Sequence, residues 1–382
     1  MFYDLQPDDQ KQQYKQMLGI IGKLTHLFSD NACPYLPYRV QENVFCKYFN
    51  ADNLSRSDCS ADAKKGNIGV GLKTWMGNND QKVAEFDSLR EILNPLVGLE
   101  LAKKVSEFRN ERIRITKNLH GIDELIYHIV KRVPNTMQIF EHVFEPIDIE
   151  NIELLPERGN INNTYFTDGK HVYHFSMSKN TLYMIFDDLI LLDAFEVNIL
   201  DDPYTYLMDL ADNIPQNFIT TPTEYDTNNK ACLRLYSTKP NGSKFVAPKS
   251  GLNQWNAGGR KRDMNEIYIP FPVEDRERYA GFFPNRDQPF ELLLPDGTMI
   301  SAKVCQQDNK AIMSNPNKVL GEWLLRKVFE LPENTLLTYE MLEVFGIDCV
   351  VFTKLGDLRY SVDFAELGTY EKFTEKETTD ED

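Results

Sequence analysis

Hydrophobic and polar positions follow different periods in the two parts of the chain. Apolar residues recur every three or four positions from residue 14 to residue 28, which predicts a helix that ends at the prolines of CPYLPY. The same reasoning predicts further helices at about 40–49, 80–93, 99–110 and 122–132, and strands at 171–176 and 181–186. The first part of the chain is therefore expected to mix helices with strands.

After residue 264 the pattern changes to short apolar runs separated by turn residues. NEIYIPFP, PFELLLPDGTMISAKV, IDCVVFTK and DLRYSVDF predict strands, and PDGT and TKLGDL predict two hairpins. Two helices, at about 317–329 and 338–345, interrupt these strands. We therefore predict a two-domain α/β (α+β) protein whose second domain is a mostly β barrel.

The loop 237–263 is rich in Gly, Pro, Ser and Lys, and we place the domain boundary there. The expected organisation is a first domain at 1–240, a second at 241–366 and an acidic disordered tail at 367–382.

Composition places the chain among globular proteins large enough for two domains, with 382 residues, 42% hydrophobic and 26% charged. Apolar runs stay below the ~18 residues needed to cross a bilayer, and the N-terminal residues lack a signal-peptide pattern. We therefore expect a cytoplasmic protein without a membrane partner. The six isolated cysteines match neither a disulfide framework nor a zinc motif.

The net charge of −16 argues at first against a nucleic-acid partner. Most of that charge lies in two stretches, 180–229 with ten acids and no Lys or Arg, and 366–382 with seven acids and two lysines. By contrast, 239–270 holds six basic residues against two acids, and 101–133 holds eight against four. An acidic protein can thus present basic surfaces, although solvated helix faces explain 101–133 equally well.

Residues 60–77, SADAKKGNIGVGLKTWMG, place glycine at alternate positions of a predicted strand. We predict a hairpin with the four-residue turn KKGN, in which Ala63 faces Ile68 and the opposite face is apolar. We expect the glycines to let a large rigid ligand approach the backbone beside charged side chains. The glycine face would carry Asp58, Ser60, Asp62, Gly69, Gly71, Lys73 and Trp75.

A carboxylate beside a lysine suits phosphodiester hydrolysis, in which carboxylates hold Mg²⁺ and the lysine stabilises charge. Asp62 and Lys73, preceded by a helix that carries Glu42, resemble the PD-(D/E)XK nuclease core of type II restriction endonucleases. The resemblance implies that Asp62 and Glu42 ligate Mg²⁺ and that Lys73 activates or orients the attacking water. The acid expected two residues before the lysine falls on Gly71, and we assign its role to Glu42.

Asp58, Gln81 and Glu85 are reserve catalytic candidates, the last two lying one turn apart on a predicted helix. The alternative is an exposed hairpin whose acid and lysine only pair with each other. Phospholipase D type nucleases need a His-x-Lys, and none of the six histidines has a lysine two residues later.

Residues 250–272 place Arg, Asn and Gln, the residue types that read base edges, on a Gly-rich loop. From 250 to 364 the chain resembles the C-terminal B3-like DNA-recognition domain of certain restriction endonucleases, in GLNQWNAGGRKRDMNEIYIPFP, FFPNRDQPFELLLPDGT, NPNKVLGEWLLRK and DCVVFTKLGDLRYSVDF. The resemblance implies a pseudobarrel that inserts two arms into the major groove. One arm would carry Asn253, Trp255, Asn256, Arg260, Lys261 and Arg262, and the second would be 309–310 or 315–318.

Two alternatives stay open for this loop, namely that Trp255 is a packing residue and that Arg260–Arg262 is a solvated charge run. Taken together, the residues favour a Mg²⁺-dependent type II site-specific deoxyribonuclease that acts on double-stranded DNA. A double-strand break needs two active sites, so we expect a homodimer, and a cognate DNA methyltransferase in the same system. The alternatives are a non-catalytic sequence-specific DNA-binding protein and a modification-dependent or nicking nuclease.

Overall fold

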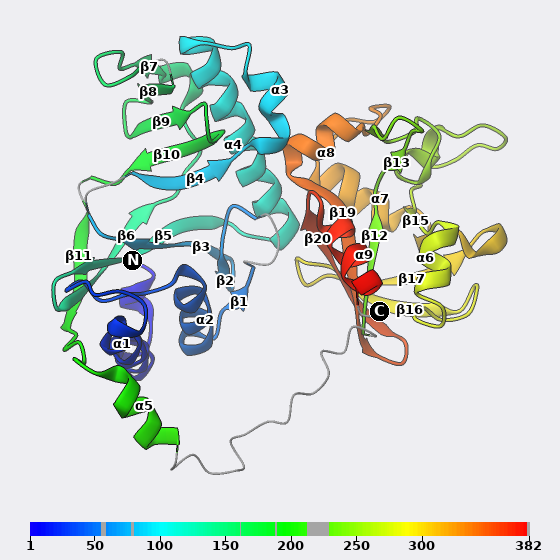
Figure 1. The fold of residues 1–382 in the computed structure, drawn as a ribbon. Coiled ribbons are helices and arrows are strands. Elements are labelled where there is room, and N and C mark those ends of the chain that lie inside the picture. The colour runs from blue at the N-terminus through cyan, green and yellow to red at the C-terminus, as the bar shows by residue number, and fades with distance from the viewer. Residues whose placement is uncertain (55–58, 78–79, 161, 188, 212–228, 380–382) are drawn as a thin grey trace. The chain divides into compact units, whose positions relative to one another are not determined.

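The computed structural model describes residues 1–54, 59–77, 80–160, 162–187, 189–211 and 229–379. The chain divides into two compact units, the first formed chiefly by residues 1–223 and the second chiefly by residues 224–382 (Figure 1). This division lies earlier in the sequence than the predicted boundary at residue 240. Among the described helices, none is both long and apolar enough to span a membrane.

A six-stranded mixed sheet forms the centre of the first unit, in the order β1-β2-β3-β5-β6-β11. Only β3 and β5 run parallel, because helix α4 (Gly98–His120) lies between them in the chain and allows the crossover. Helices α1 (Asp8–Lys23) and α2 (Tyr38–Phe49) cover one face, where Val70 and Leu72 are buried. The strands are β1 (Asp52–Asn53), β2 (Ala63–Lys65), β3 (Ile68–Trp75), β5 (Glu124–Val133), β6 (Thr136–Val143) and β11 (Ile190–Glu196).

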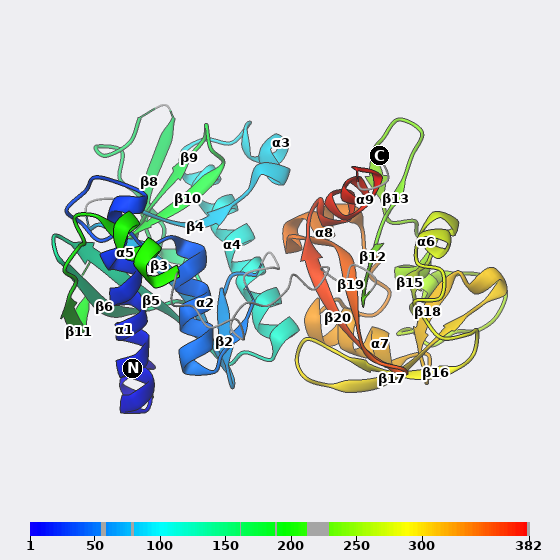
Figure 2. The ribbon, with the colours of Figure 1, turned by 60° about the horizontal axis from the view of Figure 1, so that its bottom comes forward.

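A second sheet of the first unit is antiparallel throughout, in the order β4-β10-β9-β8-β7. Figures 1 and 2 show β8, β9, β10 and β4 side by side. The predicted strands at 171–176 and 181–186 are confirmed as β9 and β10. The strands are β4 (Gln81–Glu85), β7 (Glu153–Leu154), β8 (Asn163–Thr167), β9 (Val172–Ser176) and β10 (Thr181–Ile185), and the short helices of this unit are α3 (Arg90–Leu93) and α5 (Pro203–Ala211).

Two helix predictions in this unit are wrong. Residues 122–132 form most of β5, an interior strand buried on both faces. Such a strand is apolar at nearly every position, so its sequence also contains the spacing of a helix, and the helix prediction followed from that spacing. Residues 80–93 begin with β4 and become helical only from Asp87. The predicted helices at 40–49 and 99–110 are confirmed within α2 and α4, and the one at 14–28 is confirmed as far as Lys23, where α1 ends and a 3-10 turn, Thr25–Leu27, follows.

The second unit contains a seven-stranded sheet in the order β12-β19-β20-β16-β17-β18-β15. Its edge strands β12 and β15 contact each other, so the sheet is nearly closed into a barrel around one hydrophobic core. Both predicted hairpins are confirmed, as β16–β17 and β19–β20. The strands are β12 (Lys230–Arg234), β15 (Ile269–Pro270), β16 (Pro289–Leu293), β17 (Met299–Cys305), β18 (Ala311–Ser314), β19 (Ile347–Gly356) and β20 (Arg359–Glu366).

The second unit also contains short helices and a two-stranded ribbon outside the seven-stranded sheet. Helix α7 (Val319–Gly321) continues as a π-helical segment, Glu322–Val328, and α8 (Tyr339–Phe345) precedes β19, as predicted for both positions. The remaining elements are α6 (Val273–Arg278) and the two-stranded ribbon of β13 (Ser237–Thr238) and β14 (Lys244–Phe245).

The ends of the second unit differ from the sequence-based expectation. Strand β12 lies before residue 240, yet it pairs with β19 and therefore belongs to the barrel. The tail expected to be disordered from residue 367 contains helix α9 (Thr369–Thr379). Glu371 anchors α9, since its carboxylate lies 2.7 Å from Lys244 Nζ and accepts a hydrogen bond of 2.7 Å from the Tyr236 hydroxyl.

Candidate nucleic-acid interface and catalytic hairpin

A buried carboxylate organises the Gly-rich loop of the second unit. The Glu266 side chain is 2% exposed and accepts a hydrogen bond from Arg260. Its Oε1 also lies 3.4 Å from Arg262 Nε, and its Oε2 accepts a hydrogen bond of 2.8 Å from Asn317 Nδ2. A buried carboxylate is tolerated only with such partners. Glu266 therefore ties the loop to the turn at 315–318.

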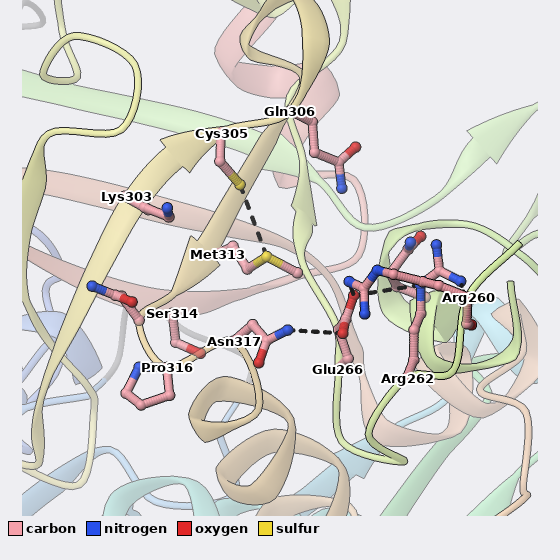
Figure 3. Close-up of a pocket in the computed structure, with 12 residues that line it drawn as sticks. Arg260, Arg262, Glu266, Lys303, Cys305, Gln306, Met313, Ser314, Pro316 and Asn317 are labelled. Atoms are coloured by element: carbon pink, nitrogen blue, oxygen red, sulfur yellow. Dashed lines mark hydrogen bonds and ion pairs between the residues drawn. The ribbon is translucent and has the colours of Figure 1, made fainter.

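A cavity of about 620 Å³ lies between this loop, the turn and the end of β17 (Figure 3). Its lining combines cationic with amide side chains, notably Arg260, Lys303, Gln306, Asn315 and Asn317. The Arg260 side chain is 57% exposed, although Glu266 holds one end of its guanidinium group. The cavity thus presents oriented donors to solvent, as a groove that binds a polyanion requires.

Some residues predicted to contact DNA serve the loop itself. Asn253 is fully buried, where its Nδ2 donates to the Leu337 carbonyl at 2.9 Å and its Oδ1 accepts from the Leu337 amide at 3.0 Å. Arg262 donates from Nη1 to the carbonyls of Ala257 at 2.6 Å and Gly258 at 2.9 Å. Both side chains therefore hold the loop together, and their assignment as base-reading residues stays a prediction.

The other predicted loop residues are distributed between packing and solvent. Trp255 is partly buried against the hydrophobic core, in agreement with the packing alternative. Asn256 is exposed, although its Nδ2 donates to the Pro248 carbonyl at 2.8 Å, and Lys261 is exposed as well. Of the six predicted contacts, Arg260 is the one that lines the cavity while keeping more than half of its side chain in solvent.

Sequence reasoning missed Lys303 and Gln306 as lining residues. Lys303 occupies an ordinary alternating position of β17, so its own neighbours in the sequence carry no signal of a binding role. Only the barrel topology brings this end of β17 to the loop. The turn at 315–318, one of the two segments considered for a second arm, does contribute to the same cavity.

In the first unit, the hairpin at 60–77 forms with a different register. Ala63 pairs with Val70 and Lys65 with Ile68, which leaves a two-residue turn in place of the predicted four. Gly66 has a φ of 61°, a left-handed conformation that glycine adopts at little cost and that permits the tighter turn. A shift of two residues leaves every side chain on its predicted face.

The alternating glycines make room for a neighbouring strand. A Cβ on Gly71 would lie 2.8 Å from Cδ1 of Tyr127, and one on Gly69 would lie 2.6 Å from Cδ2 of Leu125. These are the residues that pair with the two glycines on β5. Large side chains beside glycine on the adjacent strand are a known way to fill a sheet surface. The expectation that a ligand approaches over these glycines is therefore corrected.

Asp62 and Lys73 lie at the margins of this filled surface. Asp62 Oδ2 accepts a hydrogen bond of 2.7 Å from the Leu72 amide. Lys73 Nζ lies 5.8 Å from the centre of the Tyr127 ring, within the range of a cation–π contact. Among the described residues, no salt bridge joins Lys73 to Asp62. The alternative in which these two charges pair with each other is therefore not what the structure contains.

Glu42 lies on α2, against the face of the sheet that carries Val70 and Leu72, whereas Lys73 shares the glycine face. Glu42 is buried, with Oε2 2.9 Å from Arg39 Nη1. Burial and the negative charges of three nearby carboxylates, Glu42, Asp52 and Asp62, together raise the pKa of the Cys46 thiol to about 12. Glu42 and Asp62 thus act on one thiol, and Asp52 is a further acid that the sequence did not indicate.

The reserve candidates do not join this group. Asp58 lies outside the described residues. Gln81 and Glu85 lie on a strand rather than a helix, and a bulge puts Gln81 opposite Met184 and Glu85 opposite Thr181, on different faces. Within the part of the chain that the structure describes, no three His, Cys, Asp or Glu side chains are close enough to hold a metal ion.

A nearly closed barrel with a polar cavity beside a Gly-rich loop agrees with the predicted class, B3-like DNA-binding domains. Residues 227–356, about a third of the chain, match the family model of the NgoFVII C-terminal B3-like DNA-binding domain. No curated protein matches the chain. The prediction of a B3-like domain is confirmed by this match, and the nuclease fold of the first unit stays a prediction.

Proposed function

We propose that this protein is a site-specific DNA endonuclease of a restriction system, in which the second unit reads the sequence and the first unit cuts. The match of residues 227–356 to a restriction-enzyme B3-like domain is the observation that carries this proposal. It supports a double-stranded DNA partner directly, and the cutting activity rests on the hairpin of the first unit.

Recognition is assigned to the cavity organised by Glu266. Arg260 is exposed and held at one end, so little side-chain entropy is lost when the rest of its guanidinium group contacts a guanine edge. The amides of Gln306 and Asn315 suit adenine, and Lys303 suits a phosphate oxygen. Each good base contact discriminates by about 1–3 kcal/mol, so three or four define a short site.

Catalysis is assigned to Asp62 and Lys73, with Glu42 as a second carboxylate. Mg²⁺ keeps several waters and is commonly held by only one or two protein carboxylates, so Asp62 and Glu42 would be enough to hold it without a third protein ligand. Bound there, Mg²⁺ would polarise a phosphoryl oxygen and acidify a water molecule.

Lys73 would supply positive charge to the cleavage site. The Tyr127 ring supports its ammonium group, and no carboxylate neutralises it among the described residues. Its charge is thus available to steady the attacking water or the charge that develops on the phosphate. A double-strand break further implies two copies of this site, hence a homodimer, and a methyltransferase that protects the host sequence.

The test is digestion of long unmethylated DNA of known sequence, with Mg²⁺ or EDTA, by the wild type, by Lys73→Ala and by Lys23→Ala, an exposed lysine of the same unit. Discrete fragments that require Mg²⁺, persist in Lys23→Ala and vanish in Lys73→Ala are the expected result. Fragments that persist in Lys73→Ala would overturn the assignment of Lys73.

A second candidate function is a non-catalytic sequence-specific DNA-binding protein. The glycine in place of the expected acid, and the side chains that fill the glycine face, favour it. Intact DNA that shifts on a gel, with either metal condition, would select this function over the first.

A further inference from the structure

Three aromatic rings form a continuous row across the second sheet of the first unit. Tyr165 on β8 pairs with His174 on β9, and His174 pairs with Tyr183 on β10. The ring centres of Tyr165 and His174 are 4.7 Å apart at 22°, and those of His174 and Tyr183 are 4.6 Å apart at 5°. The rings are therefore stacked in register, one per strand.

This row lies on the side of the sheet away from the core. The alternating residues of the same strands, Phe166, Tyr173, Phe175, Leu182 and Met184, are fully buried and supply the packing. The row itself is partly exposed, with His174 at 12%. Since the opposite face already packs the core, a row of rings at the solvent side is a surface that a ligand can use.

Positive charges lie beside the row, together with the carboxylates of Asp80 and Glu85. Lys82 on β4 pairs with Tyr183, and its side chain is 59% exposed while bonded to Glu85. Arg158 and Lys179 are exposed and close enough to Tyr165 and His174 to act on their pKa values. In the part of the chain that the structure describes, neither Arg158 nor Lys179 forms an ion pair.

The middle ring is held in place and kept neutral. His174 Nδ1 lies 2.5 Å from Asp80 Oδ2, and the imidazole is stacked between the two phenols. Burial lowers the pKa of His174, and the nearby Lys179 lowers it further, against the opposing effect of Asp80. The imidazole covers the inner faces of the two phenols, which leaves the outer faces of Tyr165 and Tyr183 for a base.

We infer that this face of the sheet binds an unpaired segment of nucleic acid, whose bases stack on the outer rings while its phosphates meet the neighbouring cations. Aromatic platforms with basic surroundings are the usual way to bind single strands without reading their sequence. A duplex is disfavoured because its base faces are already stacked inside the helix. The inference uses residues outside both the catalytic hairpin and the cavity of the second unit, so it is independent of the proposed function.

The test is fluorescence anisotropy of the full chain in EDTA with three labelled probes of equal length: a single-stranded oligothymidine, an abasic deoxyribose oligomer and a duplex. We expect the oligothymidine to bind at least tenfold more tightly than the abasic probe, because only the former can stack. Equal affinity for these two probes would reduce the site to a charged surface and overturn the inference.

Substitutions of the outer rings test whether the oligothymidine binds at this row and not elsewhere on the molecule. Tyr165→Ala and Tyr183→Ala should each weaken oligothymidine binding about tenfold, and Tyr165→Phe and Tyr183→Phe should restore it, because the phenyl ring still stacks. Lys23→Ala is the matched control and should bind as the wild type does. Loss of binding in Arg260→Ala but not in Tyr165→Ala would assign the single strand to the other unit and overturn the inference.

Surface charges give a second measurement that does not depend on removing a packed ring. Arg158→Gln and Lys179→Gln alter exposed side chains and should fold normally. Each should lower the slope of log affinity against log salt by about 0.7 for a single strand, as expected for one lost phosphate contact. An unchanged slope in both variants would contradict the placement of the phosphates beside the ring row.

Discussion

The hairpin at 60–77 and the loop at 250–263 both present polar side chains on glycine-rich backbone, yet the two regions use glycine in opposite ways. In the hairpin, Gly69 and Gly71 are buried beneath Leu125 and Tyr127 of the next strand. In the loop, a Cβ added to Gly258 or Gly259 would have no described atom of another segment within 4 Å. A glycine inside a paired strand is filled by its neighbour, whereas a glycine in a loop stays open to a partner.

The largest expected effect concerns catalysis at the filled hairpin. Asp62→Asn removes the charge of the carboxylate that accepts from the Leu72 amide, and cleavage should fall at least a hundredfold while duplex binding in EDTA is unchanged. Initial rates on supercoiled plasmid measure this. If the variant cuts at the wild-type rate, the hairpin has only a structural role, and the loop at 250–263 is the one of the two regions that acts on DNA.

The next effect tests the glycines themselves. Gly71→Ala places a Cβ against the Tyr127 ring, where it should destabilise the first unit by about 2–3 kcal/mol. Gly258→Ala meets open space and should change the free energy of unfolding by less than about 0.5 kcal/mol. Urea unfolding of both variants measures the two changes in the free energy of unfolding. Equal effects would show that strand and loop glycines do not differ in this way.

The third prediction tests whether the exposed loop at 250–263 contacts DNA, through a substitution of Arg260. Arg260→Ala should weaken binding to the cognate duplex by about 2 kcal/mol, because a base contact is lost, and should leave non-specific binding nearly unchanged. Lys261→Ala, on the neighbouring exposed residue, is the control for charge alone. A uniform loss on every sequence would make Arg260 a phosphate contact rather than a base contact.

The smallest effect concerns the glycine turn of the β16–β17 hairpin, where an aspartate beside the glycine is held by hydrogen bonds. In the β16–β17 hairpin, Asp296 Oδ2 accepts from Trp323 Nε1 at 2.9 Å and lies 2.7 Å from Lys327 Nζ. Although burial opposes it, these hydrogen bonds and that of Thr298 lower the pKa of Asp296 to about 2.

A lowered carboxylate pKa stabilises the folded state above the unfolded value near pH 4, and this contribution disappears as the pH falls toward 2. Asp296→Asn should therefore cost about 1–2 kcal/mol at pH 7 and progressively less below pH 4. Urea titrations at several pH values measure the difference, with Asp357→Asn in the other hairpin turn as the control. A difference that does not shrink in acid would assign the loss to packing.

Local chemistry was enough to predict much of the fold. PDGT and TKLGDL specified their hairpins, because turn residues act on their immediate neighbours. Strand alternation placed Asp62 and Lys73 on one face even though the register was two residues off. The interior strand β5 was missed, because burial on both faces erases the period that distinguishes a strand from a helix.

Long-range packing decided the rest. The residue pattern was enough to predict the barrel hairpins, the B3-like resemblance and the faces of the hairpin at 60–77. Folding brings Tyr127 over Gly71, and it brings Arg260 and Asn317 to buried Glu266, although Asn317 lies 51 residues after Glu266 in the chain. The physical reason is that hydrogen-bonding and turn preferences act between near neighbours, whereas the occupant of a cavity is set by strands that meet only after folding.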